Sequence, residues 1–358
     1  MKIGIVGGGI NGLCAAWRLG RAGHEVILFE RDRVLSHTSS ASSKLLHGGL
    51  RYLEQFRLRL VAESLRERYW WLEHVPQHAR ELRLLYPIYE HGQRPPWLVR
   101  SGLALYQALA GRRRLGPVKR WSADELAEIC PDLRAKGLIC AYEFSDGQME
   151  ERALGRWVAD RAKEAGCEIK EETPVERVDA SGTICLNDRE VECDWVLNMA
   201  GPWAADIAAK SGISLRHSLD LIRGSHLILD RPCWKGWMLE IPGEKRIFFV
   251  LPWKGRSLVG TTEIRQLLAD PIECSEEELN YLLAAYNRYF SPSATREEVV
   301  DRFAGVRPLI RSSEDPTKAS REYIIEKHGR CVTVLGGKWT TARALGERLV
   351  RELKHEFH

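Results

Sequence analysis

Three glycines near the start of the chain have the spacing of a dinucleotide-binding turn. Gly7, Gly9 and Gly12 lie between an apolar, β-branched run at residues 2–6 and a segment of helical composition at residues 13–22. In such a turn the first glycine permits a tight bend, the second lets the backbone approach a pyrophosphate, and the third lets helix and strand pack closely. The helix N-terminus then faces the phosphates. The residues predicted here to hold a dinucleotide are Gly7, Gly9, Ile10, Asn11 and Gly12.

A carboxylate and a second glycine pair extend this motif. Glu30 ends a second predicted strand at residues 25–30, where a carboxylate can bind ribose hydroxyls. Near the other end of the chain, a predicted strand at residues 332–335 runs into Gly336-Gly337 and then into a helix from about residue 340 to residue 354. A second GxGxxG motif is absent from the sequence, and a second helix N-terminus behind a glycine pair suits the flavin end of FAD. An ordinary loop is the alternative for this segment.

The most informative stretch lies between these two motifs. It is rich in serine at residues 36–43 and continues with Lys44, His47, a glycine pair at 48–49 and Arg51. Hydroxyl groups and a lysine are donors for phosphate, and paired glycines let the backbone contact a flat ring. A flexible Ser/Gly loop is the alternative, which the three basic side chains disfavour.

The composition limits the class of protein. A length of 358 residues predicts two domains. The net charge of +4, from 53 basic and 49 acidic residues, argues against a dedicated nucleic-acid partner. Nine cysteines without a CxxC pair or zinc spacing predict reduced thiols and no metal site. The chain runs from Met1 straight into its first strand and has no apolar run of the roughly 20 residues that span a bilayer, so we expect a cytoplasmic protein, soluble or peripheral.

Matches to one enzyme family extend over nearly the whole chain. The run from Thr38 to Glu54 strongly resembles the FAD-dependent glycerol-3-phosphate dehydrogenases, where Thr-Ser-Ser-Ala-Ser-Ser-Lys-Leu-x-His-Gly-Gly-Leu-Arg-Tyr-Leu-Glu is characteristic. The wider superfamily includes the D-amino-acid oxidases and glycine oxidases. The further segments that match in order are 198–203, 223–226, 249–253, 260–262, 281–283, 305–308, 320–323 and 336–341.

The resemblance implies the fold, the cofactor and the reaction. It implies oxidation of sn-glycerol 3-phosphate to dihydroxyacetone phosphate by hydride transfer to flavin N5, with electrons passed to a quinone or another acceptor. The residues predicted to contact FAD are Gly7, Gly9, Ile10, Asn11, Gly12, Glu30, Ser39, Ser40, Ser43, Lys44, Gly48, Gly49, Val175, Ala200, Gly201, Gly337, Lys338 and Thr340. The residues predicted to line the substrate site are Arg51, Tyr52, His226, Arg307, Arg321 and Lys338.

The chemistry of these side chains agrees with that reaction. A phosphate monoester carries close to two negative charges, which Arg307, Arg321 and Lys338 together can neutralise. His226 is the first candidate for the base that removes the hydroxyl proton, because an unperturbed imidazole has a pKa near neutral. Arg51 or Arg307 would stabilise the developing alkoxide. A satisfied core histidine is the alternative for His226, and His47 is interpreted as structural, packed under the flavin.

We predict an α/β fold with two interleaved domains. One is a Rossmann-like FAD-binding domain, similar to that of glutathione reductase, and the other is an antiparallel β-sheet with helices that binds the substrate. The FAD-binding domain is predicted to comprise residues 1–75, 145–212 and 304–358, and the substrate-binding domain residues 76–144 and 213–303.

Several alternatives stay open at this point. The same scaffold could oxidise another small anionic substrate, such as a 2-hydroxy acid or an amino acid, or serve as a flavin-binding subunit without its own turnover. The apolar segment 97–110, followed by Arg112–Arg114, fits either a helix on an anionic membrane surface or a core helix with a solvated charged end. Members of the family usually continue into a helical C-terminal domain, whereas this sequence stops at His358, so dimerisation, the electron acceptor and the substrate stay open. A partner subunit is the alternative to a membrane surface.

Overall fold

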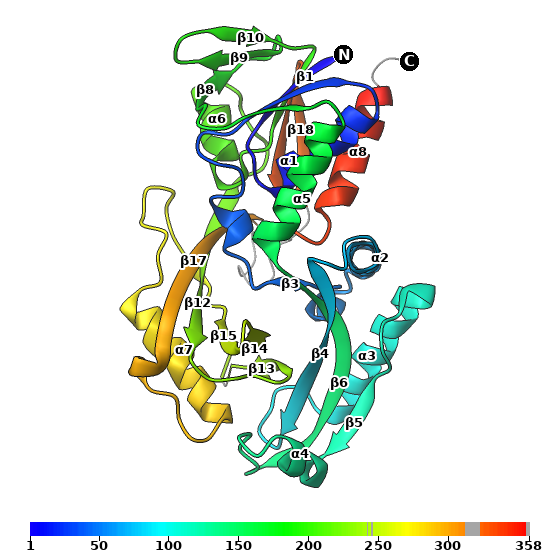
Figure 1. The fold of residues 1–358 in the computed structure, drawn as a ribbon, viewed down its shortest axis with the longest axis vertical. Helices are drawn as coiled ribbons and strands as arrows, with labels where there is room; N and C mark the ends of the chain where they lie inside the picture. The colour runs from blue at the N-terminus through cyan, green and yellow to red at the C-terminus, as the bar shows by residue number, and fades with distance from the viewer. Residues whose placement is uncertain (242, 245, 312–322, 356–358) are drawn as a thin grey trace.

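The computed structural model describes residues 1–241, 243–244, 246–311 and 323–355. Its long axis runs from a six-stranded sheet, at the top of Figure 1, to a larger sheet at the bottom. Predicted residue Arg321 lies outside the described residues.

The six-stranded sheet forms the end of the molecule that carries the glycine turn. Its order is β18-β19-β11-β1-β2-β7, and its strands are parallel except for β18. Their bounds are Tyr323–His328, Cys331–Gly336, Trp195–Asn198, Lys2–Val6, Glu25–Phe29 and Glu168–Lys170. Strands from all three segments of the predicted FAD-binding domain therefore meet in one sheet, while the domain boundaries themselves stay a prediction.

Both faces of this sheet are covered, as is usual for a parallel sheet. Successive residues of a strand point to opposite faces, so Ile5 packs against one helical layer while Val6 packs on the other side. The first layer contains α1 (Ile10–Arg21), α5 (Glu151–Glu164) and α8 (Ala342–His355). The second contains α6 (Ala204–Lys210) and a small sheet of β8 (Val175–Val178), β9 (Thr183–Leu186) and β10 (Glu190–Glu192).

A ten-stranded sheet forms the other end. Its main path is β16-β12-β15-β14-β13-β4-β6-β3, with β17 on β12 and β5 on β6. In that order the bounds are Ile264–Arg265, Leu219–Leu229, Arg256–Gly260, Ile247–Trp253, Gly236–Glu240, Ala79–Tyr89, Leu138–Met149 and Leu45–Leu46, then Val299–Ile310 and Lys119–Ser122.

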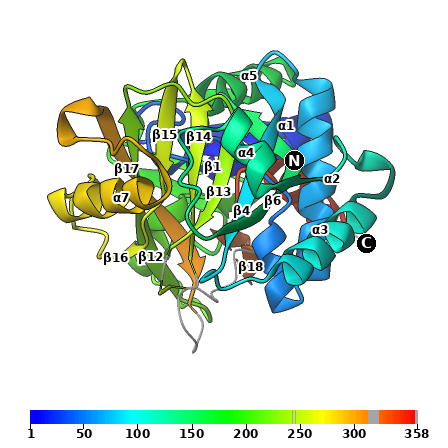
Figure 2. The same ribbon diagram turned by 90° about the horizontal axis from the view of Figure 1, so that it is seen from below.

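Helices cover this second sheet from two sides. Figure 2 shows α7 (Glu276–Tyr289) at one side and α2 (Leu58–His74) with α3 (Pro96–Ala110) at the other. The remaining helices are α4 (Ala123–Ile129) and the short 3₁₀ turns η1 (Thr38–Ser40), η2 (Leu50–Gln55), η3 (Gly111–Arg113), η4 (Gly201–Trp203) and η5 (Arg296–Glu298). Within the described residues, no helix is both long and apolar enough to cross a membrane.

The local predictions are largely confirmed. The spacing of Ser275 and Glu278 predicts a capping box at the start of a helix. This box, the Lys2–Val6 strand and the helix that follows that strand are all present. The helical spacing of apolar residues from Tyr52 to about Leu72 predicts one long helix, but this prediction is wrong: the chain breaks at Phe56, which adopts a left-handed conformation with φ of 54°. The break separates η2, which carries Arg51 and Tyr52, from α2.

Candidate active site

A cavity of about 470 Å³ lies at the carboxyl ends of the parallel strands, where open α/β sheets bind their ligands. Its wall includes the last residues of β1, β2 and β19 and the loop after β11. The larger sheet completes the wall with residues of β12 and β17. Segments from both ends and the middle of the chain therefore enclose one space.

The glycine turn is built as its spacing predicts. Gly7 has a φ of +111°, and a Cβ there would lie 2.6 Å from the Met199 carbonyl oxygen. A Cβ on Gly12 would lie 2.0 Å from the Gly7 oxygen. The first turn of α1 can therefore lie this close to the Gly7 backbone only because residue 12 is a glycine. Ser39 Oγ accepts a hydrogen bond of 3.0 Å from the Ile10 N–H. The N-terminus of α1 thus meets the serine-rich segment at the cavity.

A buried amide suits a polar ligand at this turn. Asn11 lines the cavity, and its Oδ1 is buried without a hydrogen-bond partner in the described part of the chain. Gly337 lies against it: a Cβ there would be 2.5 Å from Asn11 Nδ2. The two glycine turns predicted from opposite ends of the sequence therefore meet in space. An unsatisfied buried amide calls for a partner, which the phosphates or hydroxyls of a dinucleotide can supply.

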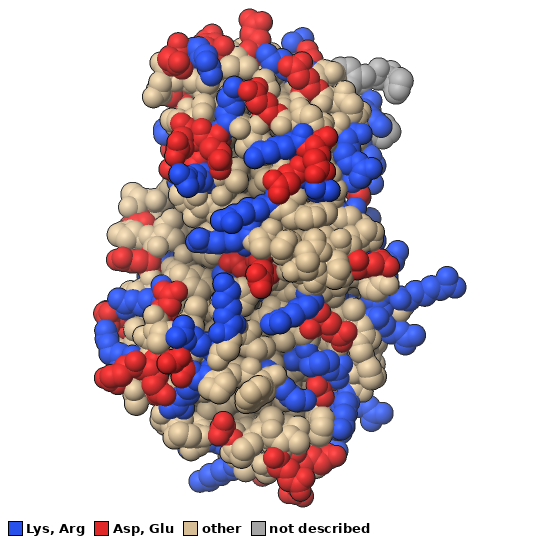
Figure 3. Space-filling model, viewed as in Figure 1, with Lys and Arg blue, Asp and Glu red and all other residues tan. Residues whose placement is uncertain are grey.

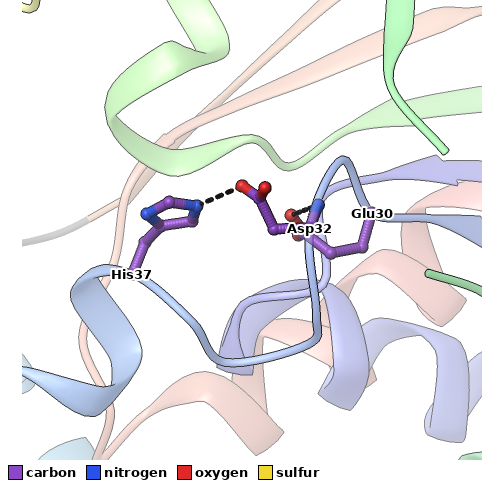
Figure 4. A group of neighbouring side chains, drawn as sticks. All are labelled: Glu30, Asp32 and His37. Carbon is purple, nitrogen blue, oxygen red and sulfur yellow. Dashed lines mark hydrogen bonds and ion pairs between the residues drawn. The ribbon is translucent and has the colours of Figure 1, made fainter. Parts of the chain in front are cut away.

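The carboxylate at the end of β2 is held in a fixed orientation (Figure 4). Glu30 Oε2 accepts a hydrogen bond of 2.6 Å from the Gly8 N–H, and Oε1 accepts one of 3.0 Å from the Asp32 N–H. Asp32 lies 2.7 Å from His37 Nε2, and this hydrogen bond is the largest cause that lowers the pKa of Asp32. One carboxylate oxygen each of Glu30 and Asp32 and one ring nitrogen of His37 all lie within 4.8 Å of one another. Because Glu30 and His37 line the cavity beside the glycine turn, ribose hydroxyls fit this group.

The wall beyond Glu30 includes residues that the sequence analysis missed. Arg31 lies 4.0 Å from the centre of the Trp203 ring, and both residues line the cavity. Arg31 lies just after β2, and Trp203 lies in η4, which follows β11. The two elements are far apart in the sequence. The Pro202-Trp203 pair was visible as a motif, but its partner could be found only once the strands were placed together.

His226 is the most deeply buried of the predicted substrate residues at this cavity. It lies on β12, and its Nε2 is 2.9 Å from Ser43 Oγ. The ring stacks on Phe303 of the paired strand β17, with 4.9 Å between centres and 13° between planes. Its Nδ1 is buried and has no hydrogen-bond partner among the described residues. Burial, with the charges of Lys44 and Arg307, holds the pKa of His226 well below its usual range, so the ring is neutral at pH 7.

Two cations reach the same cavity from different elements. Arg307 extends from β17; its Nη2 donates a hydrogen bond of 2.9 Å to the Thr262 carbonyl, and its Nη1 lies 3.6 Å from Glu263. Lys338 follows β19; its Nζ donates a hydrogen bond of 2.9 Å to Ser64 Oγ. The Lys338 ammonium also lies 4.6 Å from the centre of the Tyr52 ring. Both cations are therefore fixed by neighbours rather than free to swing through solvent.

The structure divides the predicted residues into two groups. Those that line the cavity are Gly7, Gly9, Ile10, Asn11, Glu30, Ser39, Ser43, Tyr52, Val175, Ala200, Gly201, His226, Arg307, Gly337, Lys338 and Thr340. Those placed behind or beside its wall are Gly12, Ser40, Lys44, Gly48, Gly49 and Arg51.

Lys44 differs most from its predicted place. Its ammonium forms a buried ion pair with Glu151 on α5 instead of facing the cavity. Burial lowers the pKa of Lys44, while the Glu151 charge opposes that shift. A phosphate donor was expected here, but the carboxylate satisfies the lysine inside the protein. His47, interpreted as structural, lines the cavity.

Comparisons with known proteins agree with this geometry. The family model described as FAD dependent oxidoreductase (DAO) matches residues 2–352. D-erythritol 1-phosphate dehydrogenase of Brucella abortus is 35% identical over 99% of this chain and 73% of its own. Aerobic glycerol-3-phosphate dehydrogenase of Escherichia coli K12 is 32% identical over 98% of this chain and 72% of its own.

A solved structure shares the fold. The glycerol-3-phosphate dehydrogenase from Bacillus halodurans, complexed with FAD, superposes with a TM-score of 0.80 at 22% identity. The match covers 100% of this chain and 65% of that chain, so this chain spans somewhat less than two thirds of that enzyme. The predicted Rossmann-like α/β fold and the FAD cofactor are confirmed. With its glycine turn, its oriented Glu30 and a family match over nearly its whole length, the chain belongs to the FAD-dependent oxidoreductases of the DAO family.

Proposed function

We propose that this protein oxidises the secondary alcohol of a short polyol phosphate, and that sn-glycerol 3-phosphate is its substrate and dihydroxyacetone phosphate its product. The observation that carries the proposal is the meeting of two fixed cations, Arg307 and Lys338, with a neutral buried histidine, His226, in one cavity. The names of the relatives, a D-erythritol 1-phosphate dehydrogenase and several glycerol-3-phosphate dehydrogenases, support a phosphorylated polyol.

Arg307 and Lys338 bind the phosphate group in this proposal. A guanidinium offers a planar pair of donors to two phosphate oxygens, and an ammonium adds a point charge. The contacts of Arg307 with Thr262 and Glu263 fix the plane of its guanidinium. Lys338 is held in the same way between Ser64 and the ring of Tyr52. A carboxylate would need one such cation, whereas a phosphate dianion uses both.

His226 removes the hydroxyl proton of the substrate. A neutral imidazole can accept a proton, and the lowered pKa of His226 keeps the ring neutral at physiological pH. Nε2 accepts the hydrogen bond of the Ser43 hydroxyl, so the substrate gives its proton to Ser43 Oγ while Ser43 passes its own proton to Nε2. Bound FAD supplies the hydride acceptor for the carbon that carries this hydroxyl.

The substrate class can be tested by anaerobic reduction of the bound flavin. The FAD-loaded protein is mixed without oxygen with glycerol 3-phosphate, D-erythritol 1-phosphate, glycerol, glycolate or glycine, and the loss of oxidised-flavin absorbance is followed. We expect rapid bleaching by a polyol phosphate. We expect none by glycerol, because glycerol has no phosphate group for Arg307 and Lys338 to bind. Bleaching by glycine or glycolate alone would replace the proposal with an amino-acid or 2-hydroxy-acid substrate, and no bleaching by any compound would favour a flavin-binding subunit.

We also propose that the protein works at the cytoplasmic face of a membrane and passes electrons to a quinone. The outer face of α3 supports this, because Trp97 is 67% exposed and Leu98 and Leu105 are also exposed. Arg100 is exposed on the same helix and Arg112–Arg114 follow its end, and Figure 3 shows basic residues gathered along the edge where α3 lies in Figure 1. Exposed apolar side chains among arginines suit an anionic lipid surface.

Sedimentation with lipid vesicles tests the membrane part of this proposal. We expect the protein to sediment with anionic vesicles and not with zwitterionic ones, and we expect Trp97→Gln to weaken that binding severalfold. Trp234→Gln is the matched control, because Trp234 is 90% exposed but lies outside α3. Equal binding by both variants and the original protein would exclude α3 as the contact. A steady-state assay that compares a soluble quinone with oxygen tests the acceptor.

A further inference from the structure

A buried polar cluster lies behind the cavity wall and joins three elements. Arg68 of α2, Tyr106 of α3 and Asp146 of β6 are each at most 3% exposed. Arg68 Nη1 donates a hydrogen bond of 3.0 Å to Asp146 Oδ1, and the Tyr106 hydroxyl donates one of 2.9 Å to Asp146 Oδ2. A buried ion pair gains little net stability over apolar packing, so a cluster of this kind suggests a role in orientation.

The cluster holds one backbone N–H of the loop that reaches the cavity. The N–H of Gly48 donates to the Tyr106 hydroxyl at 2.8 Å and to Asp146 Oδ1 at 3.2 Å. A Cβ on Gly48 would lie 2.4 Å from both the Tyr106 hydroxyl and Leu65, so the close approach requires glycine here. The Gly48 N–H therefore points into the protein and anchors the loop to it.

On both sides of Gly48 the loop supplies cavity residues. His47 lines the cavity directly before the anchor, and Tyr52 lines it four residues after. Gly49 has a φ of +79°, and a Cβ there would lie 2.2 Å from the Tyr52 ring. The Tyr52 ring in turn lies beneath the ammonium of Lys338. Displacement of Gly48 would therefore move the wall at several points.

We propose that Arg68, Asp146 and Tyr106 are positioning residues that fix His47 and Tyr52 in the cavity wall through the Gly48 N–H. None of the three lines the cavity, so each acts through the loop. A wall that is already ordered lowers the entropic cost of binding FAD, because less of the protein must be immobilised when the cofactor enters. The inference rests on the FAD cofactor and is independent of the proposed substrate.

Tyr106→Phe tests the anchor, because it removes one hydroxyl and keeps the ring. We expect about tenfold weaker FAD binding, the scale of one lost hydrogen bond, measured by fluorescence titration of the apoprotein. We also expect a changed absorbance spectrum of the bound flavin. Tyr289→Phe is the matched control: its buried hydroxyl donates a hydrogen bond of 2.7 Å to the Glu240 carbonyl, and it does not line the cavity.

The comparison of the two variants decides between positioning and general packing. If both lose thermal stability to a similar extent but only Tyr106→Phe changes FAD affinity and the flavin spectrum, the proposal holds. Unchanged FAD affinity and spectrum in Tyr106→Phe, or equal changes in Tyr289→Phe, would overturn it. If Tyr106→Phe does not fold, Gly48→Ala tests the same anchor with Gly102→Ala as its control, because a Cβ on Gly102 has no atom of the described residues within 4 Å. Equal FAD affinity in these two alanine variants would also overturn it.

Discussion

Replacing His226 with asparagine is expected to lower kcat with glycerol 3-phosphate by about 10²–10⁴-fold while FAD stays bound, the range that a positioned base contributes. The amide fills much of the space of the imidazole and keeps a polar atom near Ser43, but it cannot accept the hydroxyl proton. The measurement is the rate of flavin reduction in anaerobic stopped flow, which separates chemistry from reoxidation. The flavin absorbance of the purified variant reports that the cofactor is present.

The pH dependence of the unmodified protein adds an independent check. The pKa of His226 is lowered well below its usual value of about 6.5, because the ring is buried and Lys44 and Arg307 lie near it. The base must be neutral, so activity is retained as pH falls through 6.5 and is lost only below that value. The groups that face the ring are Ser43, Lys44, Phe303 and Arg307.

A control histidine completes this prediction. His24 is half-buried and lies at the opposite end of α1 from the glycine turn, outside the cavity wall. We expect His24→Asn to reduce the flavin at the original rate. If His226→Asn also reduces it at that rate, His226 is a core histidine and another group accepts the proton.

Arg307→Ala is expected to raise the KM for glycerol 3-phosphate by about a hundredfold, since a hydrogen-bonded charge contributes about 1.5–3 kcal/mol. The variant should still bind FAD, because the glycine turn and Glu30 lie on other elements. Arg307→Lys should recover only part of the loss, since an ammonium keeps the charge but not the planar fork. Steady-state kinetics over a wide range of substrate concentration measure both effects.

A second arginine on the same strand provides the control. Arg302 lies on β17, forms an ion pair of 2.7 Å with Glu276, and is not part of the cavity wall. We expect Arg302→Ala to keep the original KM. An unchanged KM in Arg307→Ala would remove Arg307 from the phosphate site, and a tenfold rise in both variants would point to a general loss of surface charge.

The features that the sequence predicted best are those whose geometry depends only on residues close to one another in the chain. The glycine turn, the strand before it and the Ser275 capping box follow from steric limits within a few residues. The sequence does not predict the long β4–β6 pair, because two prolines at 87 and 96 indicate an irregular segment where the structure extends β4 to Tyr89. The structure shows why the proline is tolerated: among the described residues, β13 pairs with β4 at Leu84 and Leu85 and not at Pro87, so that edge of β4 is open there.

In the candidate active site, too, the sequence predicted local features but not contacts between distant residues. The residue types of the 38–54 segment indicated a phosphate and a flat ring, but its spacing could not show where each side chain points. Lys44 is satisfied by Glu151, which is 107 positions away in the sequence. The Gly48 N–H is held by Tyr106 and Asp146, on elements that sequence alone could not place beside it. Local patterns predict the kind of chemistry, whereas distant partners decide which group faces the ligand.

The order of the six-stranded sheet has a consequence for synthesis on the ribosome. The glycine turn after β1 emerges first, but one neighbour of β1 is β11 at residues 195–198, and β11 needs β19 at residues 331–336. Lys338 and Thr340, which complete the wall, emerge later still. A nascent chain therefore carries a prepared turn that cannot yet enclose its cofactor, and the edge of the apolar strand β11 stays unpaired until β19 arrives. Capture of FAD must therefore wait for the segment that follows β19, and β1 waits even longer for β11 than β11 waits for β19.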